Sequence, residues 1–237
     1  MNSLIDTIDS QDWSRVATGM HAQGYALLPK FLSAEQCLAA QELYAAPNIY
    51  RKTVVMERYR FGLGQYKYWR YPLPDMVQTL RQHIYPHLVP IANGWMHALG
   101  MDKRFAPSLA ELQAQCAAAG QHLPTPLILK YGVGGFNTLH QDLYGEVFFP
   151  MQLVLFLNQP ERDYSGGEFV LTEQVPRAQS KAIVLRPGQG DMMLITTQFR
   201  PVKGVRGYYR ANMKHGVSAV TSGQRNTLGI IFHDAAS

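Results

Sequence analysis

Hydrophobic residues recur every three or four positions over much of residues 11–120, with polar residues between them. This period is typical of helices that bury one face. Ser33 and Ser108 stand directly before two such patterns, where their hydroxyls can cap a helix, and Pro74 begins the longest one. Residues 1–124 are therefore predicted to form a mainly helical N-terminal part.

A different pattern begins near residue 125. Short apolar or alternating runs follow one another, separated by Gly, Pro, Asn and Asp: LILKYGV, VFFPMQLVLFL, GEFVLTE, AIVLRP, DMMLITT, YYRANMKHGVSAV and RNTLGIIFH. Strands of this length and spacing favour a sandwich or barrel over a doubly wound α/β sheet. We expect an α+β fold class with a mainly β core in residues 125–237, N-terminal helices packed against it, and a single domain over residues 1–237.

The stretch 51–71 interrupts the helical part with β-branched, aromatic and basic residues, and its glycines at positions 62 and 64 predict a hairpin or a mobile loop. Aromatic rings could stack on bases while cations meet phosphates, as in proteins that bind single-stranded nucleic acid. Equally, the stretch could be a lid whose rings pack on the core while its cations remain in water. The candidate substrate-binding residues are Arg58, Arg60, Tyr66, Lys67, Tyr68, Trp69 and Arg70.

The composition indicates the class of protein and its cellular location. The chain has 237 residues, 46% of them hydrophobic, so it can bury a sizeable core. Only Cys37 and Cys116 are present, which argues against a disulfide framework or a thiolate metal site. No secretory leader or membrane-spanning run is recognisable, so we expect a cytoplasmic protein without a membrane partner. The net charge of +5 is weakly consistent with a polyanionic partner.

The sequence Thr138-Leu139-His140-Gln141-Asp142 contains a candidate metal site. In an extended segment, residues i and i+2 project to the same face, so His140 and Asp142 can reach one ion together. His215, on a strand-like run further along the chain, is the best third ligand. Two histidines and one carboxylate occupy one face of an octahedral metal and leave the other open, an arrangement associated with non-haem Fe(II) oxygenases.

Arg225 follows His215 by ten residues, at the start of the last predicted strand, and Thr227 lies two residues further on. On an adjacent antiparallel strand such an arginine can lie deeper than the metal. Its guanidinium would then offer two parallel hydrogen bonds to a dicarboxylate whose other end chelates the ion. The hydroxyl of Thr227 can assist it.

Together, His140-x-Asp142, His215 and Arg225 resemble the signature of the 2-oxoglutarate/Fe(II)-dependent dioxygenase superfamily, whose core is a double-stranded β-helix, or jelly-roll. HQDLYGEVFFPMQLVLFLNQP, SGGEFVLTEQ and KHGVSAVTSGQRNTLGIIFHDA are similar to a bacterial oxygenase family predicted to act in oxidative demethylation of damaged DNA bases. The resemblance implies Fe(II), 2-oxoglutarate and O₂ as cofactor and cosubstrates. It also implies that Tyr131 hydrogen-bonds 2-oxoglutarate.

The resemblance further implies hydroxylation of a C–H bond with release of succinate and CO₂, acting on alkylated bases in single-stranded or damaged nucleic acid. The turn Ser165-Gly166-Gly167-Glu168 is similar to that of prolyl-hydroxylase-like members, so a peptidyl or small-molecule hydroxylase remains an alternative. A non-enzymatic metal-binding β-barrel is a further one. The sequence does not specify an oligomeric state.

The other histidines are interpreted structurally. His83 and His87 are expected to be surface or helix-packing residues, because Pro86 lies between them. His233 and Asp234 are expected to cap the end of the last strand.

Overall fold

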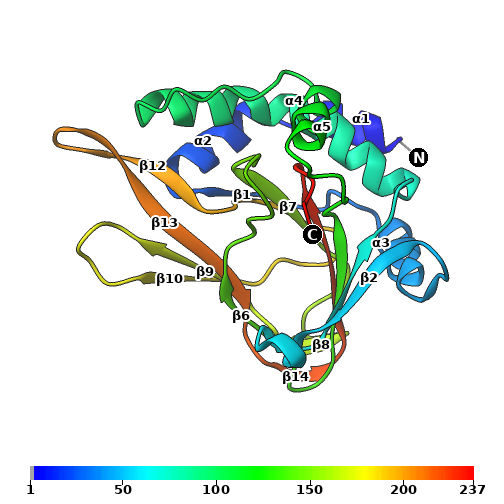
Figure 1. Ribbon diagram of the computed structural model, residues 1–237. Helices are drawn as coiled ribbons and strands as arrows, with labels where there is room; N and C mark the ends of the chain where they lie inside the picture. Colours follow the sequence, from blue (N-terminus) through cyan, green and yellow to red (C-terminus); the bar gives the residue numbers. More distant parts are fainter. Residues whose placement is uncertain (1–2) are drawn as a thin grey trace.

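The computed structural model describes residues 3–237 and contains two main β-sheets with helices gathered across one side (Figure 1). The helices are α1 (Leu4–Asp9), α2 (Trp13–Gln23), α3 (Ala34–Glu42), α4 (Asp75–Ala98) and α5 (Leu109–Ala118), with 3-10 turns η1 (Leu43–Ala45) and η2 (Met56–Tyr59). The strands are β1 (Tyr25–Leu28), β2 (Tyr50–Val55), β3 (Gly62–Leu63), β4 (Gln65–Trp69), β5 (Leu127–Tyr131), β6 (Phe136–His140), β7 (Met151–Phe156), β8 (Tyr164–Gly166), β9 (Phe169–Gln174), β10 (Lys181–Leu185), β11 (Met192–Thr196), β12 (Phe199–Gly204), β13 (Gly207–Val217), β14 (Val220–Gly223) and β15 (Arg225–Ile231).

The major sheet has the strand order β1-β11-β7-β15-β5-β4-β2, and all its pairs are antiparallel. Both of its faces are covered, so every residue of the central strand β7 is buried. Leu153 and Leu155 pack on the helices, whereas Val154 and Phe156 point between the sheets. This two-residue alternation explains why a strand with two apolar faces reads as a nearly continuous hydrophobic run.

The minor sheet has the order β10-β9-β13-β6-β3, and β12 pairs with β13 to form a long hairpin. It lies opposite the inner face of the major sheet, so a second apolar core fills the space between them. Two antiparallel sheets facing one another with helices outside confirm the expected α+β class and the jelly-roll core.

The N-terminal part does more than supply helices. Strand β1 extends one edge of the major sheet, and the β2–β4 hairpin extends the other. The stretch 51–71 thus contains the hairpin that its composition predicted. Helix α4 continues through Pro86 and Pro90 as one element. His87 stacks on the ring of Trp13 at 4.4 Å, which agrees with a helix-packing role.

The end of the last strand is buried and was not predicted correctly. Asp234 forms an ion pair with Arg81 of α4, whose side chain has no exposed surface. His233 is also fully buried, and its Nδ1 accepts a hydrogen bond from the Phe149 backbone N–H. These two residues therefore anchor α4 and a neighbouring loop to the sheet and do not cap a strand in solvent.

Two further observations concern the cysteines and the length of the apolar helices. Cys37 and Cys116 are both buried free thiols. Among residues 3–237, no helix is long and apolar enough to cross a membrane.

The Arg81–Asp234 pair makes a testable contribution to stability. Replacing Asp234 with Ala leaves a buried guanidinium without its carboxylate, so we expect the free energy of unfolding to fall by about 3–5 kcal/mol. Urea denaturation followed by circular dichroism measures this change. Asp102→Ala, at an exposed position, is the matched control and should change stability little. A loss below about 1 kcal/mol in Asp234→Ala would contradict the structural role.

Candidate active site

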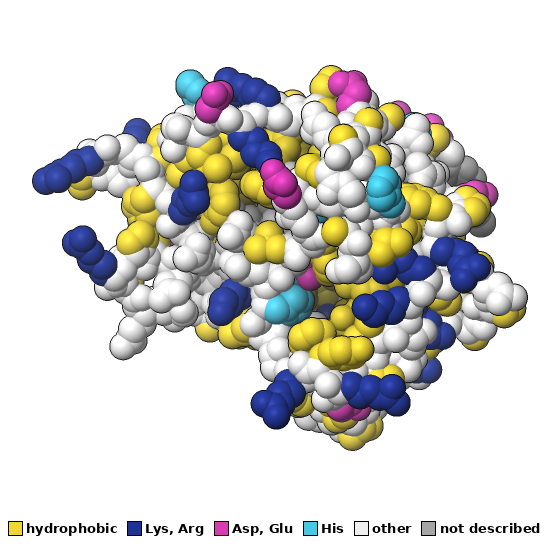
Figure 2. Space-filling model, in the orientation of Figure 1, with side chains coloured by type: hydrophobic (Ala, Val, Ile, Leu, Met, Phe, Trp, Pro, Cys, Tyr) yellow, Lys and Arg dark blue, Asp and Glu magenta, His cyan; other side chains and the backbone are white. Residues whose placement is uncertain are grey.

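A cavity of about 240 Å³ opens between the two sheets. Its walls come from β4, β5, β7 and β15 on one side and from β6, β9 and β13 on the other. Figure 2 shows this face of the molecule, with hydrophobic side chains around the hollow and Lys and Arg side chains near it. Of the predicted site residues, those that line the cavity are Tyr66, Tyr68, Tyr131, His140, Asp142, His215, Arg225 and Thr227.

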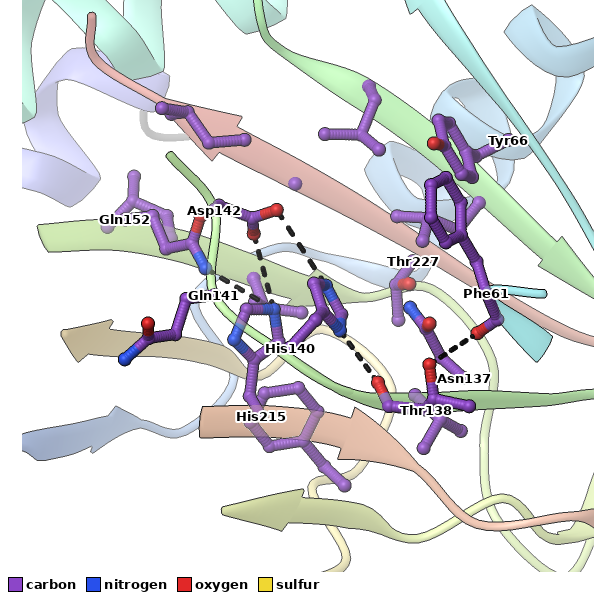
Figure 3. A pocket seen from close by; sticks show the side chains of 18 of the residues that line it. Phe61, Tyr66, Asn137, Thr138, His140, Gln141, Asp142, Gln152, His215 and Thr227 are labelled. Atoms are coloured by element: carbon purple, nitrogen blue, oxygen red, sulfur yellow. Dashed lines mark hydrogen bonds and ion pairs between the residues drawn. The ribbon is translucent and has the colours of Figure 1, made fainter. Parts of the chain in front are cut away.

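His140 and His215 meet because of strand register. Strands β6 and β13 pair antiparallel, and His140 lies directly opposite His215. Side chains at such positions project to the same face of a sheet within contact distance. The two imidazole rings accordingly lie 4.2 Å apart between their centroids (Figure 3).

Asp142 completes the cluster from the segment that follows β6. Its Oδ1 lies 3.7 Å from Nε2 of His140, and its Oδ2 lies 3.3 Å from Nε2 of His215. One candidate ligand atom from each of the three residues lies within 4.8 Å of the others. An ion at their centre would therefore be reached by two imidazole nitrogens and one carboxylate oxygen, a set suited to Fe(II).

The protonation states of these side chains suit metal binding. Burial and the nearby His215 lower the pKa of His140, which favours the neutral imidazole. Its Nδ1 lies 2.8 Å from the Thr138 carbonyl, so the N–H donates there and the Nε2 lone pair faces Asp142. Burial alone would raise the pKa of Asp142, but the hydrogen bond with His215 and the nearby imidazole of His140 lower it overall, so the carboxyl is ionised.

Arg225 occupies the deep end of the same cavity. It is 1% exposed, and its Nε and Nη1 atoms have no hydrogen-bond partner. Aromatic rings surround it, with the Tyr131, Phe156 and Tyr164 centroids 5.5–6.0 Å from its Cζ. Among residues 3–237, no carboxylate pairs with it. An unpaired buried guanidinium is costly, and it marks a place for an anionic ligand.

Tyr131 and Thr227 stand beside Arg225. Tyr131 lies directly opposite Arg225 in the β5–β15 pair, and its buried hydroxyl also lacks a partner. Burial raises the pKa of Tyr131 to about 12, so the hydroxyl keeps its proton and can donate. Thr227 is two residues along β15 on the same face and is 3% exposed. Three donors thus converge on the same end of the cavity.

The turn before β9 makes room for Arg225. Gly166 and Gly167 have φ angles of 69° and 61°, which favour glycine. A Cβ at Gly167 would lie 2.9 Å from Cδ of Arg225. Glu168 does not face the arginine, because its carboxylate binds Arg186 and the Ser218 hydroxyl. Gly167 therefore lets the backbone approach Arg225 closely, whereas a Cβ at Gly166 would collide with the Ala219 carbonyl.

The candidate substrate-binding residues of β4 lie on two different faces of the major sheet. Tyr66 and Tyr68 of β4 point into the cavity. Lys67 points to the other face, where its Nζ donates to the Tyr44 carbonyl at 2.8 Å. Trp69 is fully buried in the helical core. Lys67 and Trp69 are thus not placed to contact a substrate in this cavity, since side chains alternate along a strand.

The remaining three candidates, Arg58, Arg60 and Arg70, are exposed and do not line the cavity. Phe61, the residue after Arg60, lines the cavity, and its carbonyl accepts hydrogen bonds from both the backbone N–H and the hydroxyl of Thr138 (Figure 3).

Two residues beside the candidate metal ligands, Tyr144 and Gln152, also line the cavity and were not predicted from the sequence. The Tyr144 hydroxyl donates to Oδ1 of Asp142 at 2.9 Å, and it accepts from Tyr68 at 3.1 Å. Gln152 points from β7 toward the cluster, with its Nε2 3.4 Å from Nε2 of His215. A signal for Gln152 was present, because it is the one polar residue in a strand that is otherwise apolar on both faces.

Comparison with known proteins agrees with this geometry. Residues 64–235 match the Oxygenase-NA family, described as an oxygenase catalysing oxidative methylation of damaged DNA. Two uncharacterized Mycobacterium tuberculosis proteins, MT2286 and Rv2227, are each 48% identical over 165 residues, which is 70% of this chain and 71% of theirs.

Solved structures share the fold at low sequence identity. A Pseudomonas putida prolyl-4-hydroxylase has a TM-score of 0.54 at 14% identity, covering 92% of this chain and 96% of its own. A Burkholderia pseudomallei oxidoreductase of the 2OG-Fe(II) oxygenase family has a TM-score of 0.51 at 14% identity, covering 96% and 94%. A Trichoplax adhaerens prolyl hydroxylase in complex with a hypoxia inducible factor peptide has a TM-score of 0.55 at 12% identity, covering 98% and 92%.

The hydrogen bond from Tyr144 to Asp142 predicts an effect on metal affinity. Tyr144→Phe removes the hydroxyl that orients the carboxylate, and losing such a partner weakens metal binding by about 10- to 100-fold. Titration with Co(II), followed by visible absorption, measures the affinity. Tyr208→Phe, on an exposed strand position, is the control and should bind metal as the unmodified protein does. Equal affinities for all three proteins would argue against the orienting role.

Proposed function

Because the chain belongs to the Oxygenase-NA family and is a 2-oxoglutarate-dependent non-haem iron dioxygenase, we propose that it hydroxylates a C–H bond on an alkylated nucleic-acid base. His140, Asp142 and His215 would hold Fe(II). The observation that carries the proposal is the buried, unpaired Arg225 in the same cavity as this cluster. A metal site alone would not need such a cation, but a dicarboxylate cosubstrate would.

The residues fit 2-oxoglutarate at both ends. The three metal ligands occupy one face of an ion and leave room for the keto-acid end, while Arg225 and the Tyr131 hydroxyl can bind the distal carboxylate. When bound, iron and 2-oxoglutarate would supply the oxidising power together with O₂, and hydroxylation of the substrate carbon would be accompanied by release of succinate and CO₂. Thr227, two residues along β15 from Arg225, offers a further hydroxyl to the cavity.

The protein's own contribution is placement and exclusion of water. Apolar side chains such as Leu129, Val154 and Phe169 line the space between the metal ligands and Arg225. A low-dielectric wall strengthens the Arg225–carboxylate pair and limits side reactions with water. Tyr144 and Gln152 hold Asp142 and His215 in their orientations.

The cavity wall supports an aromatic substrate. Phe61, Tyr66 and Tyr68 form one side of the opening, and ring faces of this kind stack on bases regardless of sequence. The Arg51 guanidinium lies 4.5 Å from the centroid of the Tyr68 ring, so a cation stands at this wall. If the hydroxylated carbon is an N-methyl group, the product loses formaldehyde and the base is demethylated. The family description, which names damaged DNA, favours this substrate over a peptide.

Succinate and formaldehyde release test the reaction and its substrate together. We expect the purified protein, with Fe(II), ascorbate and 2-oxoglutarate, to release both products from single-stranded oligonucleotides that carry N-methylated bases. Proline-containing peptides, the competing class, should not stimulate succinate formation. Stimulation by peptides and not by methylated oligonucleotides would replace the proposed substrate while leaving the reaction class unchanged.

Asp142→Ala removes the only anionic ligand of the cluster and should abolish turnover. Asp102→Ala, an exposed carboxylate outside the cavity, serves as the control and should retain full activity. Succinate production at the unmodified rate in Asp142→Ala would contradict the assigned metal ligands. Circular dichroism of both variants separates loss of chemistry from loss of folding.

Arg225→Gln tests the cosubstrate site separately from the metal. Losing one partner of a buried charge pair costs about 2–5 kcal/mol, so the KM for 2-oxoglutarate should rise at least about 30-fold. Co(II) affinity without 2-oxoglutarate should stay unchanged, because Arg225 is not among the proposed metal ligands. Arg15→Gln, on an exposed helical position, is the charge-matched control. An unaltered KM in Arg225→Gln would refute the assignment of the distal carboxylate.

A further inference from the structure

The β12–β13 hairpin projects beyond the two sheets and is rich in basic residues. Figure 1 shows it extending away from the body of the molecule, next to the β9–β10 hairpin of the same sheet. Residues 192–233 contain no Asp or Glu, although the chain has 17 acidic residues. The hairpin's positive charge is therefore not balanced by acidic residues within its own strands.

Some of these cations serve the fold and some remain free. Arg200 forms an ion pair with Glu173 at 2.7 Å, and Arg210 lies over the Phe199 ring at 4.9 Å. Lys203 and Arg206, at the tip, are exposed, and among residues 3–237 no carboxylate pairs with them. The tip also exposes Val205 fully, so this turn packs against nothing in the chain.

A second basic tip lies beside the first. Arg177 lies in the turn between β9 and β10, Lys181 is the first residue of β10, and both side chains are exposed. Strand β9 pairs with both β10 and β13, so the two tips belong to the same side of the minor sheet. Figure 2 shows Lys and Arg side chains at both projections.

Strand β13 connects the basic tip directly to the cavity. It begins at the tip and carries His215 near its other end. His215 lies seven positions after Tyr208, a distance along the strand of about 23 Å at 3.3 Å per residue. Tyr208 is 49% exposed, so it can pack on a sugar or base near the tip. The strand therefore fixes the distance from tip to cavity, and a short polymer could span it.

We infer that the β12–β13 hairpin binds the phosphate backbone of the nucleic acid whose modified base enters the cavity. This inference rests on the proposed substrate. Phosphate contacts supply affinity and set the position of a nucleic acid without reading its sequence. At about 3.4 Å per nucleotide along one strand, the tip meets phosphates roughly seven nucleotides from the oxidised base. A strand long enough to reach the tip should therefore bind more tightly than a shorter one.

The test compares a tip variant with a charge-matched control. Lys203→Ala/Arg206→Ala removes two free cations at the tip, whereas Arg15→Ala/Lys30→Ala removes two exposed cations from the N-terminal part. Binding to a labelled 20-nucleotide single strand is followed by fluorescence anisotropy at several salt concentrations. Each lost phosphate contact reduces the slope of log K against log salt by about 0.7, so the tip variant's slope should be shallower by about 1.4. The control should keep the original slope.

Length dependence separates this inference from the proposed function. A methylated trinucleotide spans about 10 Å and cannot reach the tip. We therefore expect the tip variant to oxidise it as the unmodified protein does, but to show a higher KM for the 20-nucleotide strand. Unchanged slope and KM on the long strand, with methylated strands still oxidised, would overturn the hairpin's role alone. A shallower slope without oxidation of any methylated strand would support the hairpin and overturn the proposed substrate.

Discussion

The buried charge of Arg225 is the constraint around which the cavity is built. Taking a guanidinium out of water costs several kcal/mol unless an anion pairs with it. The surrounding rings of Tyr131, Phe156 and Tyr164 offset part of this cost through cation–π contact. Gly167 leaves space for the side chain where any larger residue would collide with it. A dicarboxylate that pairs with the arginine would stabilise the fold by mass action, so binding and folding are linked.

The register of the paired strands determines which side chains face one another in the cavity. Arg225 faces Tyr131 across one antiparallel pair, and His140 faces His215 across another. A slip of one residue in either pair would turn one member of it out of the cavity. The apolar inner faces of the strands fix the register, because a slipped strand would expose its buried residues to water. The packing of the core therefore determines where the candidate metal ligands and the cation meet.

The sequence predicted the residues of the site better than their surroundings. His140, Asp142, His215 and Arg225 were recognisable because the spacing of their chemistry is characteristic, and the structure brings all four to one cavity. Whether Tyr66 or Lys67 of β4 would face that cavity depends on pairing with β5, a contact that local spacing does not encode.

The end of the last strand also depends on contacts with residues that are distant in the sequence. The sequence led us to expect that His233 and Asp234 cap the end of the last strand. Their partners are Phe149 and Arg81, which are distant in the chain. Gln152 differs from them, since a polar residue in an apolar strand is a local signal.

The shared fold leaves the substrate open. Prolyl hydroxylases match this chain over more than nine-tenths of its length at 12–14% identity, so the two sheets tolerate nearly complete replacement of their residues. Function therefore depends on the particular residues that such a fold carries, and the fold alone does not determine it. Substrate choice must then lie in elements that extend beyond the sheets. In this chain those elements are the β2–β4 hairpin, which supplies the aromatic wall, and the basic β12–β13 hairpin. The first would hold a base and the second a phosphate backbone, and β13 runs from the second hairpin to the candidate metal ligand His215.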